Sequence, residues 1–358
     1  MYLISDPSKD HRHPKTSSGA YEWWYFDVLD QETGIGVVII FYDGLLFSPD
    51  YHIAQQKSGG EIPDKFPGIS ISVYEKGKTL FYALKGYSKD RAFFSDTRCE
   101  VMIGNNSVKV DASHQYLTYC IQLDEQLPNK LHLHGSLTFQ ANNNPPKWIA
   151  GESSDDHLWN LIHAKNNVLA NLQLARSEEI LKKITFSGSG YHDHNLGNRP
   201  IDDDFDQWYW GRIHLDGSTL VWYIMFKDDD MHQGAWVIKD KDGRVSPVDS
   251  IRLKTPAKTN IFGLSFVDKI EVGIDGLLYD IRTDYIWDQG PFYLRYKVRL
   301  TDISGTQIKG SKAGIAEFIK PNRISKKWVR PMIRVRHHND ESQAHWIQKS
   351  LRLSKWTW

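Results

Sequence analysis

The chain has 358 residues, of which 40% are hydrophobic and 13% aromatic, with 44 basic and 44 acidic side chains. A balanced charge provides no long-range field for a polyanion, so we expect no nucleic-acid partner. The length and apolar content favour two folded domains, or one large β domain, and exclude a disordered chain.

The cysteine content and the apolar runs indicate the compartment. Cys99 and Cys120 are the only cysteines, too few for a disulfide scaffold, which favours a reducing environment. Residues 1–15 lack the apolar core of a signal peptide, and the run at residues 36–41 is too short to cross a bilayer. We therefore expect a cytoplasmic protein.

Short alternating or β-branched runs, separated by Gly, Asp and Asn, recur along the chain and predict strands. In the first half they are residues 22–29, 36–41, 69–74, 108–110, 116–123 and 130–139. In the second half they are residues 207–215, 220–226, 234–238, 266–272, 277–284, 293–300 and 314–319. This pattern predicts an all-β fold.

Helical periodicity is best at the carboxyl end. Asn339 or Asp340 could cap a short helix that places Ala344, Ile347 and Leu351 on one face. The basic and aromatic residues 349–358 would suit transient contact with a membrane surface, and the alternative is that they pack on the second domain.

An aromatic strand, a turn and a second strand occur twice. Glu22–Asp27 followed by Val37–Asp43 is similar to Gln207–Arg212 followed by Leu220–Asp228, and the offset from 22 to 207 is about half the chain. Each half has enough strands to close a barrel, although a pair of β-sandwiches would give a similar pattern. We place the domains at residues 1–186 and 187–358.

The densest polar cluster lies in residues 188–197. In an extended strand, His192 and His194 share one face, while Tyr191, Asp193 and Asn195 share the other. Such a cluster could handle protons, because imidazole titrates near neutral pH and a carboxylate can orient it. The alternative is a polar seam whose side chains bond loops and bulge amides.

Zinc is a further alternative for the two histidines of this cluster. The ligands would be His192 and His194, helped by His11, His13 or the pair His337 and His338. His132 and His134 repeat the same spacing with no other supporting motif, so we expect no metal. We also expect no cofactor, because the chain has no phosphate-binding loop, serine-hydrolase elbow or dinucleotide fingerprint.

Aromatic side chains crowd the two repeated strands. Trp23 and Tyr25 lie in the first, and Trp208 and Trp210 in the second, where the inward members either wall a cavity or fill it. Glu22 begins the first strand. Its carboxyl group would be ion-paired, or would have a raised pKa that suits a general acid.

Three blocks in this order, Glu22–Asp27, Tyr191–Asn195 with Gly197, and Trp208–Arg212, resemble the pattern of the carotenoid 1,2-hydratase and AttH family, which includes Diels–Alderase-type cyclases. Fragments at residues 290–295 and 314–317 support the resemblance, which is weakest between residues 45 and 150. It implies two tandem lipocalin-like β-barrels, each about half of the chain, and a hydrophobic substrate pocket.

The resemblance also predicts site residues. His194 takes the place of the motif histidine of the hydratases, but Leu196 stands where a tryptophan usually follows. The acid that protonates the alkene should lie near Tyr223, where the stretch 220–226 contains Met225 and no acid before Asp228. Because an unactivated alkene requires a strong, well-placed acid, this departure weakens the implication of hydratase activity.

We therefore expect a cofactor-independent cyclase or isomerase that holds a long polyene, terpenoid or polyketide in an aromatic pocket, as a monomer or dimer. Hydration of an isolated C=C bond and non-catalytic lipid binding are the alternatives. The predicted catalytic residues are His194, Asp193, Glu22, Tyr191, Asn195 and Tyr223. The predicted substrate-binding residues are Trp23, Tyr25, His192, Trp208, Trp210, Met225 and Trp287.

Overall fold

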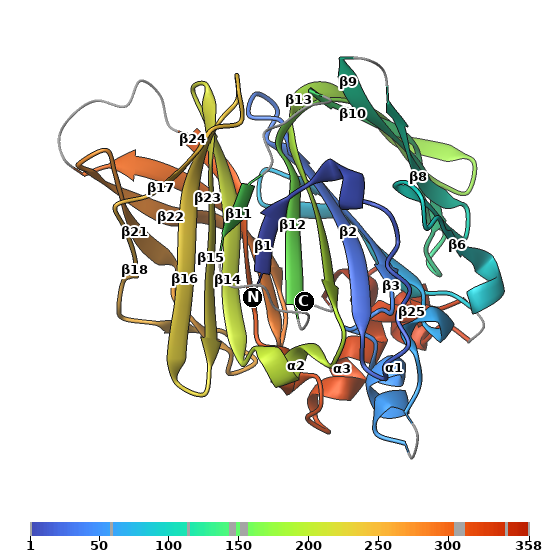
Figure 1. Cartoon of the computed structure of the whole chain (residues 1–358). Helices are drawn as coiled ribbons and strands as arrows, with labels where there is room; N and C mark the ends of the chain where they lie inside the picture. Colours follow the sequence, from blue (N-terminus) through green and yellow to red (C-terminus); the bar gives the residue numbers. More distant parts are fainter. Residues whose placement is uncertain are drawn as a thin grey trace. The chain divides into compact units, whose positions relative to one another are not determined.

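The computed structural model describes residues 2–57, 60–112, 115–142, 148–150, 157–303, 312–340 and 343–356. The chain forms two compact units, each built mainly from antiparallel strands (Figure 1). The first unit comprises Met1–Glu75, Leu80–Asp203 and Ile324–Thr357. The second comprises Lys76–Thr79 and Asp204–Arg323.

The first sheet is a meander that returns to its own beginning. Its strands are β1 (Tyr2–Ser5), β2 (Tyr21–Leu29), β3 (Ile35–Asp43), β4 (Gly68–Glu75), β5 (Lys78–Gly86), β6 (Ala92–Phe94), β7 (Glu100–Ile103), β8 (Asn106–Ala112), β9 (Tyr116–Gln126), β10 (Leu131–Asn142), β11 (Trp148–Ala150), β12 (His157–Arg176), β13 (Glu179–Gly197) and β25 (His337–Asn339). The hydrogen-bonded order is β25-β5-β4-β3-β2-β13-β12-β10-β9-β8-β7-β6, with β1 paired to β12 and β11 paired to β1. β2 therefore pairs with its successor β3 and also with β13.

The second sheet repeats this plan with fewer strands. They are β14 (Gln207–Leu215), β15 (Ser218–Lys227), β16 (Asp230–Lys239), β17 (Val245–Pro247), β18 (Ser250–Leu253), β21 (Lys269–Ile274), β22 (Leu277–Gln289), β23 (Tyr293–Asp302) and β24 (Lys312–Ile319). A two-stranded ribbon of β19 (Lys258–Thr259) and β20 (Ser265–Phe266) stands apart. β14 pairs with its successor β15 and with β24, the last strand.

The repeat seen in the sequence is thus a repeat of topology. The hairpins β2–β3 and β14–β15 hold the same place in their sheets, next to the strand that closes the meander. The ladder ends at β6 and at the β5–β25 edge in the first unit, and at β17 and β18 in the second. Each sheet is a curled half-barrel, which confirms the predicted all-β, lipocalin-like fold.

The division between the units differs from the predicted boundary after residue 186. That position lies inside β13, a continuous strand whose far end pairs with β2 of the first sheet. The chain also returns to the first unit at its end, where β25 pairs in parallel with β5. Arg334 of α3 (Val329–Arg336) supports this return by an ion pair of 3.0 Å with Asp50 of α1 (Pro49–Gln55).

The short C-terminal helix is present but differs from the predicted one. Asn339 belongs to β25, and α4 (Trp346–Lys349) begins after His345, whose side chain accepts a hydrogen bond from the Ile347 amide. Ala344 and Leu351 lie outside this helix, and the last two residues lie outside the described part of the chain. None of the described helices is long and apolar enough to cross a bilayer.

The strands around the site are buried on both faces. All nine residues of β3 and eight of the nine in β2 are buried, which explains their continuous apolar sequence. One face of β2, carrying Trp24, Phe26 and Val28, joins the core of the first unit. The alternate residues lie on the other face and do not belong to the core of the first unit, yet all of them except the half-buried Trp23 are buried.

Candidate functional site

β13 separates the predicted polar cluster into two groups, as strand alternation requires. His192 and His194 face the core of the first unit, because their cross-strand neighbours on β2 belong to that core. Tyr191, Asp193 and Asn195 turn to the opposite face. The five side chains therefore form two sites, one on each face of β13.

The core-side histidines are enclosed by aromatic rings. His194 stacks on Trp24 with ring centroids 4.5 Å apart, and His192 stacks on Phe26 at 3.9 Å. Tyr119 meets the edge of His192 at 4.7 Å. Both imidazoles are fully buried, so each ring nitrogen depends on partners within the protein.

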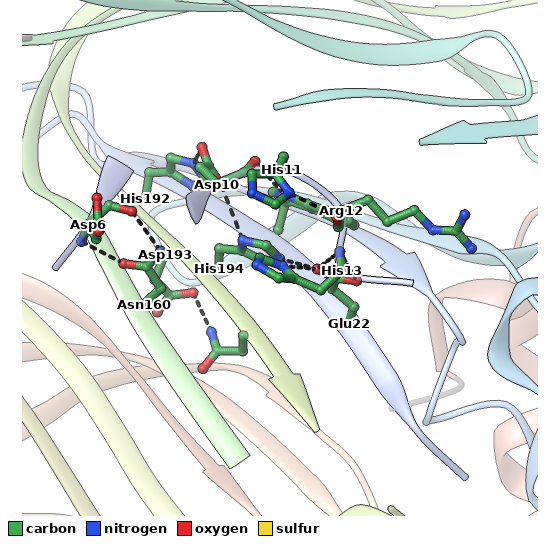
Figure 2. A network of polar contacts seen from close by, with 12 residues as sticks. Asp6, Asp10, His11, Arg12, His13, Glu22, Asn160, His192, Asp193 and His194 are labelled. Carbon is green, nitrogen blue, oxygen red and sulfur yellow. Dashed lines mark hydrogen bonds and ion pairs between the residues drawn. The ribbon is translucent and has the colours of Figure 1, made fainter. Parts of the chain in front are cut away.

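Glu22 is the ionic partner of one of these histidines (Figure 2). Its Oε1 lies 2.7 Å from His194 Nε2 and 3.1 Å from His13 Nδ1, and the His13 amide donates to both carboxylate oxygens. Lys15 Nζ lies 3.7 Å from Oε2. Glu22 is thus paired, with two histidines and a lysine.

This pairing makes Glu22 a carboxylate. Burial by itself raises the pKa of Glu22, but hydrogen bonds from His13 and His194 and the charges of His194 and Lys15 outweigh burial and lower it to about 2. The alternative of a raised pKa at Glu22 is therefore wrong. A carboxylate of this kind can orient His194, but it holds no proton near neutral pH.

His192 and Asp10 share the second buried contact. His192 Nδ1 lies 2.9 Å from the carbonyl oxygen of Tyr25, and because a carbonyl can only accept, Nδ1 carries the hydrogen. His192 Nε2 lies 3.0 Å from Asp10 Oδ2. A neutral imidazole would face this carboxylate with a lone pair, so a proton or another cation must lie between the two atoms.

A second carboxyl group lies beside Glu22, at the end of β3. Asp43 Oδ2 is 2.6 Å from Nε of Arg12. Burial raises the pKa of Asp43 more than Arg12 lowers it, and the neighbouring charge of Glu22 raises it further, to about 6. Asp43 is therefore a carboxyl group that can gain or lose a proton close to neutral pH.

We expect Asp43→Asn to remove a pH dependence of stability. An acid whose pKa is raised on folding stabilises the folded state below its unfolded pKa, and this contribution is lost as the pH rises through the folded value of about 6. When the pH is lowered from 7 to 4.5, the free energy of unfolding of the wild type should rise by on the order of 2 kcal/mol relative to that of the variant. Urea unfolding at both pH values measures this difference.

Asp96→Asn is the matched control, because Asp96 is a nearby acid that is exposed. The difference in free energy of unfolding between Asp96→Asn and the wild type should be the same at both pH values. A constant difference for Asp43→Asn as well would contradict the raised pKa.

The opposite face of β13 carries a carboxylate with three donors. Asp193 Oδ2 accepts from Trp159 Nε1 and from the Tyr191 hydroxyl, both at 2.8 Å, and Oδ1 accepts from Asn195 Nδ2 at 2.8 Å. The ring of Tyr25 meets that of Tyr191 edge-on at 6.1 Å. Asp193 is buried, and all three contacts use its oxygens as acceptors.

The second unit has a comparable face on β14 and β15. Trp208 pairs with Met225 and Trp210 with Tyr223, on the side opposite the core residue Tyr209. All four are buried. The predicted residues of the second half are therefore neighbours on one aromatic face.

The acid on this face of the second unit is in β24. Glu317 lies opposite Trp210, and its Oε1 is 2.8 Å from Nε of Arg295. Both are buried, and the guanidinium also lies 5.2 Å from the ring centre of Tyr293. Trp287, predicted to bind substrate, is buried at a register shift of β22.

Several residues of these groups were not predicted as site residues. They are Asp10, Arg12, Lys15, Asp43, Cys99, Trp159, Arg295 and Glu317. Asp10, Arg12 and Lys15 lie in the segment before β2, where the sequence shows no strand pattern to indicate burial. Trp159 lies in the long strand β12, directly before residues 160–181, whose mixed apolar and basic composition allows either a strand or a bridge between the halves.

The structure and the comparisons define the class of protein. Two curled lipocalin-like sheets are also found in the crystal structure of a protein described as AttH from Nitrosomonas europaea, with a TM-score of 0.58, 14% identity and coverage of 84% of this chain and 92% of that one. The family model described as carotenoid hydratase CrtC matches residues 38–345. The chain belongs to this family.

Curated relatives agree with this assignment. The chain is 27% identical to hydroxyneurosporene dehydrogenase of Chlorobaculum tepidum over 90% of this chain and 88% of that protein. It is 26% identical to acyclic carotenoid 1,2-hydratase of Rubrivivax gelatinosus, over 78% and 65%. It is 21% identical to a quinolone epoxide rearrangement protein of Emericella nidulans, over 63% and 59%. These relatives support an enzyme of the hydratase or the cyclase and isomerase kind.

Proposed function

We propose that the protein is a cyclase or isomerase that holds a long unsaturated hydrophobic molecule against aromatic side chains, with no cofactor in the reaction. One observation carries the proposal: in each unit the repeated strands turn aromatic side chains away from the packed core, Trp23 and Tyr25 in one, Trp208 and Trp210 in the other. Rigid aromatic surfaces that the core does not use are suited to shaping a flexible chain.

The acids on these two faces favour preorganisation over protonation. Asp193 accepts hydrogen bonds from three donors, and Glu317 is paired with Arg295. Both carboxyl groups serve as acceptors for neighbouring side chains, which favours a positioning role over proton transfer to an alkene. Met225 occupies the position near Tyr223 where the family resemblance implies an acid.

Asn195 and Tyr223 on these faces would then act as hydrogen-bond donors, whereas the Tyr191 hydroxyl already donates to Asp193. Asp193 holds Tyr191 and Asn195 in fixed positions, and the Asn195 amide has a second N–H beyond the one given to Asp193. Tyr223 is the corresponding phenol beside Trp210. A donor aimed at a carbonyl oxygen that is conjugated with the diene polarises the substrate without a free acid. The core side of the sheet carries His194, His192 and Glu22, which would hold β13 in position.

Hydration of an isolated C=C bond is the second candidate function. The family model is that of carotenoid hydratase, and one curated relative is named acyclic carotenoid 1,2-hydratase. Hydration needs a proton donor, and Asp43, with a pKa of about 6, is the described carboxyl group whose pKa is raised most clearly. It lies on the core side of the first sheet, beside Glu22.

Labelled water separates the two functions. The purified protein is incubated in H₂¹⁸O with an acyclic carotenoid, an acyclic terpenoid and a linear polyketide polyene, and the products are analysed by mass spectrometry. We expect a product of unchanged mass and altered retention time, without ¹⁸O, because cyclisation and isomerisation add no atoms. A product heavier by one labelled water would establish hydration instead.

Two controls complete this experiment. Heat-denatured protein measures uncatalysed conversion, and Trp210→Ala tests whether the aromatic face is needed. An unaltered lipid that copurifies with the protein, with none of the probes consumed, would favour a binding protein over either enzyme.

A further inference from the structure

The core of the first unit contains three potential metal ligands that approach one another, and a fourth that lies beside one of them. Ligand atoms of Asp10, Cys99 and His192 all lie within 4.8 Å of each other, and His194 Nδ1 lies 3.5 Å from Asp10 Oδ1. All four residues are buried. Figure 2 shows Asp10 beside the two histidines of β13.

Each histidine is already held by its other ring nitrogen. His192 Nδ1 donates to the carbonyl of Tyr25 at 2.9 Å, so Nε2 is the nitrogen that points to Asp10. His194 Nε2 lies 2.7 Å from Glu22, which leaves Nδ1 on the side of Asp10. A metal-binding histidine characteristically donates its other N–H to a backbone carbonyl or a carboxylate, and both arrangements are present here.

The atoms that face the centre of this cluster are not satisfied by the protein alone. Asp10 Oδ1 and His194 Nδ1 lie 3.5 Å apart as an ion pair, and among the described residues neither atom makes a well-aligned hydrogen bond, although both are buried; the Cys99 thiol and the Tyr119 hydroxyl bond the same Asp10 carboxyl group. His192 Nε2 and Asp10 Oδ2 face each other as acceptors unless a cation lies between them. Buried polar atoms that converge without well-aligned partners indicate a missing ligand.

We propose that Asp10, Cys99, His192 and His194 form a binding site for one divalent transition-metal ion of the zinc type. Nitrogen and sulfur ligands favour such an ion over magnesium or calcium. The site would also be electrically balanced, because a carboxylate and a thiolate offset a charge of two in a buried place where net charge is costly. This proposal departs from the expectation of no metal, and it does not depend on the proposed reaction.

Asp10, Cys99 and His192 supply three ligands, and with His194 Nδ1, 3.5 Å from Asp10, as the fourth the site would be closed and structural, because catalytic zinc sites keep a position open for water or substrate. Asp10 lies in the segment before β2, Cys99 directly before β7, and the histidines in β13. β6 and β7 are the free end of the first sheet, several strands away from β13 along the ladder. The ion would therefore connect β13 to the β6–β7 end of the sheet, and would hold the N-terminal segment against both.

The second cluster of ligand type, His13, Glu22 and His194, is better explained as support for the first. Its atoms are already hydrogen-bonded to one another, at 3.1 Å and 2.7 Å. Burial raises the pKa of the Cys99 thiol, so without a metal this sulfur keeps its proton. Binding of the ion would release that proton and form the metal–thiolate bond.

Cobalt is the probe for this site, because it replaces zinc and reports sulfur ligation by its colour. Protein stripped with a chelator under reducing conditions is titrated with Co²⁺. We expect about one equivalent to bind, with intense visible bands of a tetrahedral ion and a thiolate-to-cobalt charge-transfer band. Cys99→Ser should lose the charge-transfer band, and the matched control Cys120→Ser, at an exposed cysteine, should keep it.

Two measurements on the wild type keep the test independent of how the variants fold. X-ray absorption of the zinc-loaded protein should show one sulfur at about 2.3 Å and lighter ligands at about 2.0 Å. Zinc should also raise the midpoint of thermal unfolding. Binding well below one equivalent, or a metal shell of nitrogen and oxygen only, would overturn the proposal.

Discussion

Glu22→Gln should destabilise the first unit by about 3 to 5 kcal/mol at pH 7, the range found when one partner of a buried ion pair is removed. Glu22 is fully buried and accepts from His194 and His13 beside the ammonium of Lys15. The neutral amide would leave Lys15 without its partner in a buried place. Urea unfolding of metal-free protein measures the loss without a contribution from a bound ion.

The same carboxylate should make the protein sensitive to acid. The pKa of Glu22 is lowered to about 2 in the folded state. The stability that ionised Glu22 contributes is therefore present when the pH is above the ordinary pKa of 4.5, and it is lost as the pH falls towards 2. The difference between wild type and Glu22→Gln should therefore shrink between pH 5 and pH 3. Glu32→Gln, at an exposed acid after β2, is the control and should match the wild type throughout. Equal stability of Glu22→Gln and wild type at pH 7 would refute the ion-pair account.

Asp193→Asn should reduce turnover at least tenfold while leaving the fold intact. The asparagine can keep one acceptor oxygen, but its amide nitrogen cannot accept from Asn195, so the positions of Tyr191 and Asn195 become less defined. Small losses of orientation at a reacting group have effects of this size on rate. The substrate for this assay is the one consumed in the labelled-water experiment.

A structural effect has to be separated from a catalytic one in this variant. Its circular dichroism spectrum and thermal midpoint should stay close to those of Lys183→Gln, a control at the exposed end of the same strand. A loss of turnover that merely parallels a loss of folded protein, or turnover equal to the wild type, would remove Asp193 from the proposed site.

Local pattern was sufficient to predict most strands. β14 was predicted to the residue, and β2 to within one residue, because their aromatic and β-branched residues are bounded by turn residues on both sides. β12 was left ambiguous, since polar residues interrupt its apolar ones and register shifts near His163 break the alternation. The topological repeat could also be predicted, because the two aromatic hairpins have the same composition and spacing.

Alternation alone determined that His192 and His194 lie on one face of their strand and Asp193 on the other, because side chains of an extended chain point to opposite sides in turn. Only the tertiary structure decided which face is the core. That choice depends on β2 pairing with β13 across more than 160 residues, and on a segment before β2 that brings Asp10 to the histidines. Such pairings depend on the burial of whole sheets, which no local pattern encodes.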